Sequence, residues 1–343
     1  MKEQLFIYKS HYPELSNEIT RFIESISERL LPERTRRLFV EINNGKQKYY
    51  DTENNFEFFR LEHLDKKSIL NFLFFYLKAN HLIGTIVKSR DISNIFSFSL
   101  PLNYFVPVTK KRRFLFISKY LWQEKYSSFL VNMFIKNFVL KDAKIITFSK
   151  DSAELLKRKW GGAVYDIRPG IDSHFFTSLR RRKKRDFENI TILFFSNSSH
   201  FISKVIDEHD KNYSYIIPKI RYSHNISRKI KHLDKAGRVK YYTQSDADIL
   251  ELVPQSDVVL LHDFMPENLE LFTLEILAMN RELIFVDAPA PEFSERGIYT
   301  CKKLDEIKKL LSTIDRKKVS EVNQIILDKY NIEKTLEDLS EFL

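Results

Sequence analysis

Residues 266–287 read PENLELFTLEILAMNRELIFVD, and this stretch decides how the chain is interpreted. An apolar run, Val258–Leu261, comes just before it, and a second apolar run, Leu283–Val286, closes it. Short apolar runs bounded by polar residues are typical of buried parallel strands, and the segment between them has helical character. Two glutamates, Glu267 and Glu275, therefore stand where a buried strand ends and a helix begins.

The composition indicates a protein with two domains. The chain has 343 residues, of which 43% are hydrophobic and 14% aromatic, so apolar material for packed cores is ample. A single cysteine, Cys301, excludes an internal disulfide and fits a reducing compartment. No long apolar run follows Met1, and the longest apolar stretch, Ile69–Leu77, is about half of a membrane span. We expect a cytoplasmic protein without a signal peptide.

Charge is distributed unevenly along the chain. The net charge is +10, but residues 241–343 hold 11 basic and 21 acidic side chains and leave a surplus of +20 on the first 240 residues. A basic first part favours an anionic partner, such as a membrane surface, a phosphorylated ligand or a nucleic acid. Solvated surface lysines explain the same surplus equally well.

Strand-like and helix-like stretches alternate along the chain, which is the pattern of α/β layers. In the first half the sequence predicts strands at residues 4–8, 37–42, 56–61, 114–117 and 144–148, and helices at residues 15–31, 68–87, 124–138 and 152–160. In the second half it predicts strands at residues 190–195, 213–217, 239–242, 258–261 and 283–286, and a helical tail at residues 319–343. Asp151 and Glu154 have capping-box spacing at the start of one helix.

The alternation restarts after a basic run, Arg180–Arg185, whose composition suits an exposed linker. We therefore predict two doubly wound Rossmann-like domains that face each other across a cleft. The predicted parts are an N-terminal domain (residues 1–176), a linker (177–189), a C-terminal domain (190–318) and a closing helix (319–343). Ligands of such sheets bind at the carboxyl ends of the strands.

The 266–287 stretch has chemistry suited to a phosphate and to sugar hydroxyls. Amide groups at a helix start favour a phosphate or a sugar oxygen, and a carboxylate accepts two hydrogen bonds from paired hydroxyls. We expect the helix to start at Leu271 or Thr273, which places Glu275 in its first turn. Asn280 falls where the helix should end, at a position that needs a left-handed residue.

Three segments resemble, in order and spacing, the signature of retaining glycosyltransferases of family 4, which have the two-Rossmann-domain GT-B fold. The first is the strand–Ser–helix step at residues 145–152, and the second is the Gly-Ile-Asp turn at residues 169–176. The third is the pair of glutamates with the helix stop at residues 267–280. The tail near residues 329–334 is similar to the family's closing helix, which crosses back to the first domain. The residues before this region match the family only in layout.

The resemblance implies roles for four residues of the stretch. Glu275 would bind the ribose of a nucleotide-sugar donor, and Glu267 would hold hydroxyls of the transferred sugar. The backbone amides of Asn268 and Leu269 would approach the donor sugar or its phosphates.

The resemblance also implies a diphosphate site in the loop after the strand at residues 190–195. Lys204 fits the family's lysine, whereas Asn197 stands near the position of an arginine and carries no charge. The family's glycine-rich first loop is absent, and so is a histidine of the first domain. His262, next to the glutamate stretch, fits a substrate contact and a structural role equally well.

Taken together, the resemblance implies a metal-independent, retaining glycosyltransferase without a cofactor. It would move a sugar from a nucleotide-sugar donor to a glycan or lipid-linked acceptor bound by the first domain.

Asp246 and Asp248 are interpreted as a helix start and not as a metal site. Basic and aromatic residues near Lys110–Trp122 fit peripheral contact with the inner face of a membrane, or a core strand with a charged entry. No nucleic-acid recognition module is present, so we expect no nucleic-acid partner. The alternative is a catalytically inactive GT-B-like scaffold protein.

Overall fold

The structure is a computed structural model that divides the chain into two compact units. Unit 1 comprises Met1–Pro169 and Glu333–Leu343, and unit 2 comprises Gly170–Ile332. The boundary therefore falls after Pro169, whereas the sequence suggested residue 176, and most of the predicted linker (177–188) lies outside the described residues. The residues that the structure describes are 3–9, 18–29, 36–43, 56–62, 69–98, 111–117, 142–176, 189–208, 213–220, 224–242, 249–264, 266, 268–288, 291, 295, 297–313 and 325–342.

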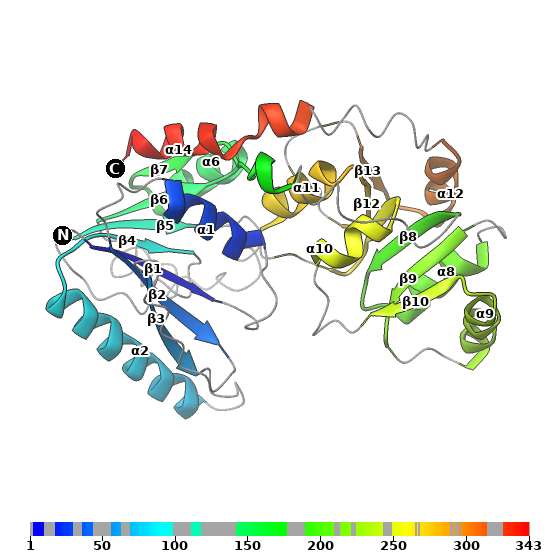
Figure 1. Ribbon diagram of the computed structural model, residues 1–343, viewed down its shortest axis with the longest axis horizontal. Helices are drawn as coiled ribbons and strands as arrows, with labels where there is room; N and C mark the ends of the chain where they lie inside the picture. The colour runs from blue at the N-terminus through cyan, green and yellow to red at the C-terminus, as the bar shows by residue number, and fades with distance from the viewer. Residues whose placement is uncertain are drawn as a thin grey trace. The chain divides into compact units, whose positions relative to one another are not determined.

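Unit 1 is built on a parallel sheet of seven strands in the order β3-β2-β1-β4-β5-β6-β7 (Figure 1). The strands are β1 (Glu3–Lys9), β2 (Arg36–Asn43), β3 (Phe56–Glu62), β4 (Ile92–Ser97), β5 (Arg112–Phe116), β6 (Ala143–Thr147) and β7 (Val164–Asp166). The helices are α1 (Glu18–Arg29), α2 (Ile69–Ser89), α6 (Lys150–Trp160) and α14 (Ile332–Ser340). The predicted helix at residues 124–138 lies outside the described residues.

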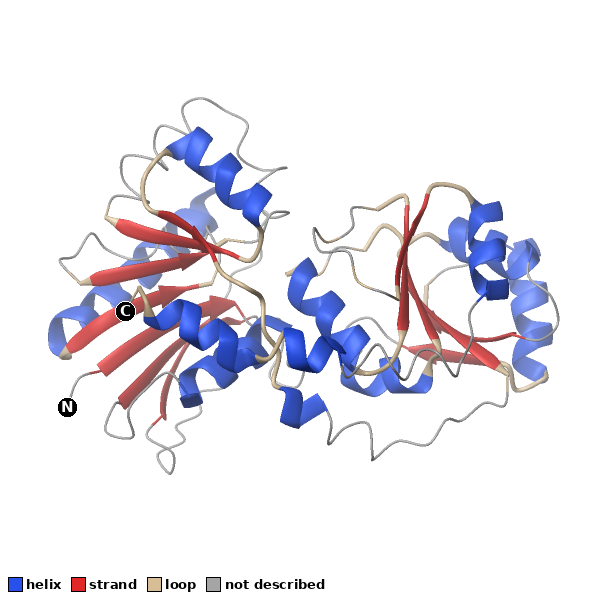
Figure 2. Ribbon diagram, turned by 90° about the horizontal axis from the view of Figure 1, so that it is seen from above, coloured by secondary structure: helices blue, strands red, loops and turns tan. Residues whose placement is uncertain are grey.

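Helices cover both faces of the unit 1 sheet (Figure 2). On one face, Phe98 and Phe116 stack with ring centroids 4.5 Å apart, and Phe22 of α1 packs edge-on against both rings. On the other face, Leu115 of β5 joins a buried cluster with Leu156 of α6. The unit is therefore doubly wound, as predicted, because neighbouring residues of one strand serve opposite layers.

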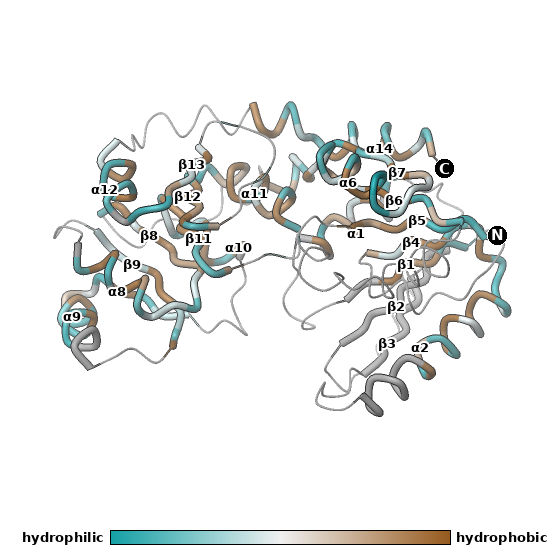
Figure 3. The backbone as a smooth tube through the Cα atoms, turned by 180° about the vertical axis from the view of Figure 1, so that it is seen from behind, coloured by the Kyte–Doolittle hydropathy of each residue, from teal (hydrophilic) through white to brown (hydrophobic). Residues whose placement is uncertain are grey.

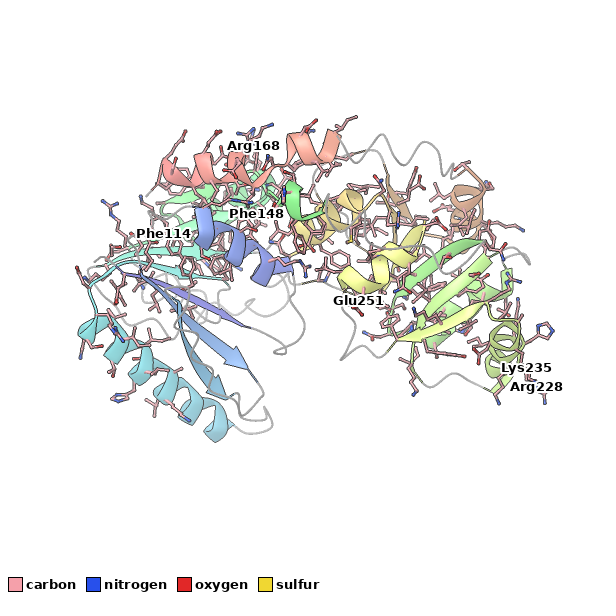
Figure 4. All side chains as sticks on the ribbon, viewed as in Figure 1. Phe114, Phe148, Arg168, Arg228, Lys235 and Glu251 are labelled. Atoms are coloured by element: carbon pink, nitrogen blue, oxygen red, sulfur yellow. The ribbon has the colours of Figure 1, made fainter. Side chains whose placement is uncertain are left out.

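The end of the chain packs on unit 1 through α14. Arg168 Nη2 lies 3.2 Å from Asp338 Oδ1, and the Thr335 hydroxyl donates to the Arg168 carbonyl (Figure 4). The prediction of one continuous helical tail is wrong. Residues 325–329 are helical, but Ile171 then donates to the Tyr330 carbonyl and accepts from the Ile332 amide. This strand-like bridge takes the backbone out of helical geometry before α14 begins.

Unit 2 has a parallel sheet of six strands in the order β10-β9-β8-β11-β12-β13. The strands are β8 (Ile190–Phe195), β9 (Tyr213–Pro218), β10 (Val239–Tyr242), β11 (Val258–Leu261), β12 (Glu282–Val286) and β13 (Ile298–Cys301). The helical segments are α8 (Ser199–Glu208), α9 (His224–Lys235), α10 (Ile249–Leu252), η2 (Val253–Gln255), α11 (Leu269–Ala278) and α12 (Leu304–Thr313). One face packs on α8, α9 and α12, and Phe195 on the other face contacts Phe272 of α11.

Every residue of α11 is buried, including its polar ones. The helix is hydrophobic over much of its length (Figure 3). The helix begins two residues earlier than the first predicted start, because Asn268 caps it by accepting a 2.9 Å hydrogen bond from the Leu271 amide. It ends as predicted, since Asn280 takes a left-handed conformation with φ 58°. A helix that is apolar on nearly all sides is typical of a protein core, and Phe272 of α11 packs against Phe195 of β8.

A different residue from the predicted one caps α6. Ser149, and not Asp151, has the extended backbone of an N-cap, and its hydroxyl accepts from the Ser152 amide at 3.0 Å. The hydroxyls of Ser149 and Ser152 are also 2.9 Å apart and buried.

We expect Ser149→Ala to lower the free energy of unfolding by about 1–2 kcal/mol, because the cap is lost in a buried setting. In Asp151→Ala, urea denaturation should detect a loss of only a few tenths of a kcal/mol. Equal losses would contradict the cap assignment.

Two glycines with positive φ offer a matched test of packing around α11. A Cβ at Gly297 (φ +92°) would lie 3.1 Å from Leu277 Cδ2, whereas one at Gly237 (φ +67°) would meet nothing within 4 Å. Gly237→Ala should therefore cost about 1 kcal/mol of stability for the left-handed backbone alone. Gly297→Ala should cost measurably more in thermal denaturation, because the Leu277 side chain would also have to give way. Equal melting temperatures for the two variants would show that Leu277 yields freely.

Candidate functional site

The strand order of unit 2 creates one edge where a ligand is expected. From β8 the chain moves outward to β9 and β10, and it then returns to the opposite side of β8 at β11. Doubly wound sheets bind ligands where this reversal occurs, at the carboxyl ends of the strands. Ser196 follows β8 and His262 follows β11, and the His262 amide donates to the Phe195 carbonyl at 3.0 Å. The two loops are thus held side by side.

Serine hydroxyls shape the loop between β8 and α8 in the absence of glycine. The fully buried Ser196 hydroxyl accepts from the Ser198 amide at 3.0 Å, and Ser198 in turn caps α8 by accepting from the Phe201 amide at 3.2 Å. The amides of Ser199 and His200 donate to no group in the described part of the chain. Two N–H groups at a helix start therefore remain for an anion.

His262 is the titratable group at the junction of the two loops. Its Nδ1 lies 3.2 Å from the Ser196 hydroxyl and 3.2 Å from Asp263 Oδ2, and its ring stacks on Phe201 at 4.0 Å with an interplanar angle of 6°. Burial lowers the pKa of His262 from its ordinary value, although the carboxylates of Asp263 and Asp287 oppose this. The imidazole is therefore neutral near pH 7.

Polar side chains are unusually frequent in and beside the buried helix α11. Asn268, Glu270, Thr273 and Glu275 are all at most 3% exposed. Asn268 serves as the N-cap of the helix, but burying Glu270, Thr273 and Glu275 costs free energy, and such groups are found more often at functional sites than in ordinary cores. Thr273 Oγ1 makes no hydrogen bond with any residue that the structure describes. The sequence interpretation did not assign roles to Glu270 or Thr273, although carboxylates inside an otherwise apolar helix were a visible signal.

Three of the four predicted site residues of the glutamate stretch lie in α11 or cap it. Glu275 is buried in α11, but it lies in the second turn and not the first, because the helix starts at Leu269. Asn268 is the N-cap, and the Leu269 amide makes no hydrogen bond among the described residues. Glu267 lies outside the described residues.

The other two predicted residues belong to the β8–α8 segment. Asn197 is exposed in the loop next to Ser196, at the carboxyl edge of the sheet. Lys204 is exposed in the second turn of α8 and forms no ion pair within the part of the chain that is described. The structure therefore brings Asn197, Asn268 and Leu269 to one edge of unit 2, with Lys204 one helical turn behind.

Within the described ranges, no three His, Cys, Asp or Glu side chains gather to hold a metal ion. Asp246 and Asp248 lie outside those ranges, so the expected metal independence stays a prediction. None of the helices described is long and apolar enough to span a bilayer.

The pKa of His262 can be measured directly. NMR titration of the imidazole should give a midpoint below the ordinary value of 6.5, because burial disfavours the cation. Asp263→Asn should lower that midpoint further, since the Asp263 carboxylate favours the charged ring. A midpoint at or above 6.5, or one raised by Asp263→Asn, would contradict this description of the junction.

The sequence matches no family model and no curated protein, but solved structures share its fold over nearly its whole length. Sucrose-phosphate synthase from Thermosynechococcus elongatus has a TM-score of 0.70 at 11% identity and covers 99% of this chain and 98% of its own. HepE from Anabaena, in complex with UDP-glucose, has a TM-score of 0.66 at 15% identity, with coverage of 99% and 98%. The lipopolysaccharide outer core galactosyltransferase WaaB has a TM-score of 0.61 at 11% identity, with 98% of both chains covered. The chain thus has the GT-B fold of these glycosyltransferases.

Proposed function

We propose that this protein is a glycosyltransferase that moves a sugar from a nucleotide-sugar donor to a glycan or lipid-linked acceptor. Unit 2 would bind the donor, and unit 1 would bind the acceptor. The reaction would retain the anomeric configuration and need no metal, as the resemblance to family 4 implies. The GT-B fold supports this class of activity, and HepE, one of the proteins with this fold, has been solved with UDP-glucose.

The observation that carries the proposal is a buried carboxylate in α11. This helix begins at the reversal edge of unit 2, which is the carboxyl edge of the sheet where the strand order reverses between β8 and β11. Glu275 of α11 is only 2% exposed, so almost no water reaches its carboxylate. A carboxylate in that setting is suited to accept two hydrogen bonds from the paired hydroxyls of a ribose. Side chains of a helix lean toward its N-terminus, so Glu275 is directed toward the end of α11 at this edge.

The diphosphate of the donor would lie at the start of α8. The amides of Ser199 and His200, which have no partner among the described residues, would donate to its oxygens. Lys204 would supply positive charge to the departing nucleoside diphosphate, which is the main electrostatic task of such a site. Asn197 offers an amide where the family has arginine, so this donor site would depend more heavily on backbone dipoles. Glu267 would hold the hydroxyls of the transferred sugar.

The acceptor would lie at the corresponding edge of unit 1, where the strand order reverses between β1 and β4. Phe98 follows β4 and Phe116 ends β5 near this edge, but both rings are buried against Phe22 of α1. Phe148, 6.2 Å from Phe116, is half-buried and is the ring of this group that reaches the surface. An aromatic ring presents an apolar face to a sugar ring or a lipid chain. The basic surplus of the first 240 residues would favour an anionic acceptor or membrane surface.

Ligand-observed NMR with a panel of UDP-, GDP- and ADP-sugars tests the donor site. We expect saturation transfer to one donor, and Glu275→Gln should weaken its binding about 10- to 100-fold, because a charge-assisted pair of hydrogen bonds is lost. Glu282→Gln is the matched control, since Glu282 is also buried but begins β12 at the opposite edge of the sheet. It should leave the affinity unchanged.

Two results would count against the proposal. If the folded protein binds no donor of the panel, the inactive scaffold becomes the better account. If a donor binds with the same affinity to Glu275→Gln, whose fold is checked by circular dichroism, the donor site lies elsewhere.

A further inference from the structure

His262 is an ionisable group at the reversal edge to which the family resemblance assigns no task. It sits directly after β11, and Phe201 of α8 lies flat against one face of its ring. Its side chain is 18% exposed, so the imidazole is packed but still reaches the surface of the edge. The same edge carries the two amides of Ser199 and His200 that have no described partner.

The two ring nitrogens of His262 have different surroundings. Nδ1 is 3.2 Å from both the Ser196 hydroxyl and Asp263 Oδ2. A carboxylate only accepts hydrogen bonds, so Asp263 favours the tautomer that carries its proton on Nδ1. The neutral ring then presents a bare lone pair at Nε2, which makes no hydrogen bond with any described residue.

A bare nitrogen lone pair repels the oxygens of a diphosphate, whereas a protonated one donates to them with a charge-assisted bond. The charged groups that raise the pKa of His262 are the carboxylates of Asp263 in its own loop and Asp287 after β12. The β8–α8 segment contributes the neutral Ser196 and Phe201. The two negative charges of a bound diphosphate would therefore favour the protonated form of His262.

We propose that His262 binds the diphosphate of the donor through Nε2 and takes up a proton from solvent as the donor binds. This inference rests on the proposed function, because it requires a donor at the reversal edge of unit 2. His262 would thereby provide the positive charge that Asn197 does not. It also makes donor affinity depend on pH, with tighter binding at lower pH.

The sign and size of the effect follow from linkage. A group whose pKa rises on binding takes up a proton, so the dissociation constant falls as the pH is lowered toward the pKa of the bound form. The free imidazole has a lowered pKa and is neutral near pH 7. A rise of about one pKa unit on binding corresponds to about a tenfold change in affinity. We expect the dissociation constant to fall severalfold, and by less than about tenfold, between pH 8 and pH 6.

Isothermal titration calorimetry with UDP-glucose, or with the GDP- or ADP-sugar that the panel selects, measures both quantities. The diphosphate of a nucleotide sugar has no pKa in this pH range, so proton uptake reports on the protein. Titrations in two buffers with different heats of ionisation give the number of protons taken up. The wild-type protein should take up a measurable fraction of a proton on binding at pH 7. His262→Gln should take up none and should bind with an affinity that does not change with pH.

His232→Gln is the matched control, because His232 is an exposed histidine on α9 of the same unit. It should keep the proton uptake of the wild-type protein. If His262→Gln fails to fold, the His262 ring signals of the wild-type protein decide, since they should move toward the imidazolium position when donor is added at pH 7.

Three outcomes separate this inference from the proposed function. Donor binding without proton uptake, at an affinity independent of pH, would overturn the role of His262 and leave the proposed function intact. Uptake that persists in His262→Gln would also overturn it, because another group would then carry the proton. The absence of binding to every donor would overturn both.

Discussion

The reversal of strand order between β8 and β11 is the constraint on which the site of unit 2 depends. Parallel strands need crossover connections, and two sets that wind in opposite directions leave the carboxyl ends of β8 and β11 adjacent at the middle of the sheet. Whatever residues follow these strands are brought together. Here they are Ser196 and His262, which are in hydrogen-bonding contact although 66 residues separate them.

A second consequence is that α11 holds polar side chains at a cost in stability. The helix is buried along its whole length, yet it contains Glu270, Thr273 and Glu275 at 2% exposure or less. Apolar residues at these positions would contribute to the core without the loss of hydration that buried polar groups suffer. Such violations of core composition are expected where a protein binds a ligand, and they distinguish α11 from α6, whose buried residues serve packing.

Much of the fold was predictable because it is encoded in continuous apolar runs. The strands at residues 190–195, 239–242 and 258–261 begin and end where predicted. The prediction missed β4, whose apolar residues are interrupted by Ser93 and Asn94, and the short strands β7 and β13. It identified the end of α11 from Asn280 but placed its start too late. Which residues pair across loops, such as His262 with Ser196, depends on sheet order, and no local pattern reveals that.

A nucleotide sugar bound at the reversal edge of unit 2 would protect the backbone amides there from exchange with solvent. Hydrogen–deuterium exchange can be measured by mass spectrometry with and without UDP-glucose and the other donors. We expect slower exchange in peptides that cover residues 196–202 and 262–272, because the amides at the starts of α8 and α11 become hydrogen-bonded to the donor. Protection confined to peptides of unit 1, or to the amino ends of the unit 2 strands, would contradict this expectation.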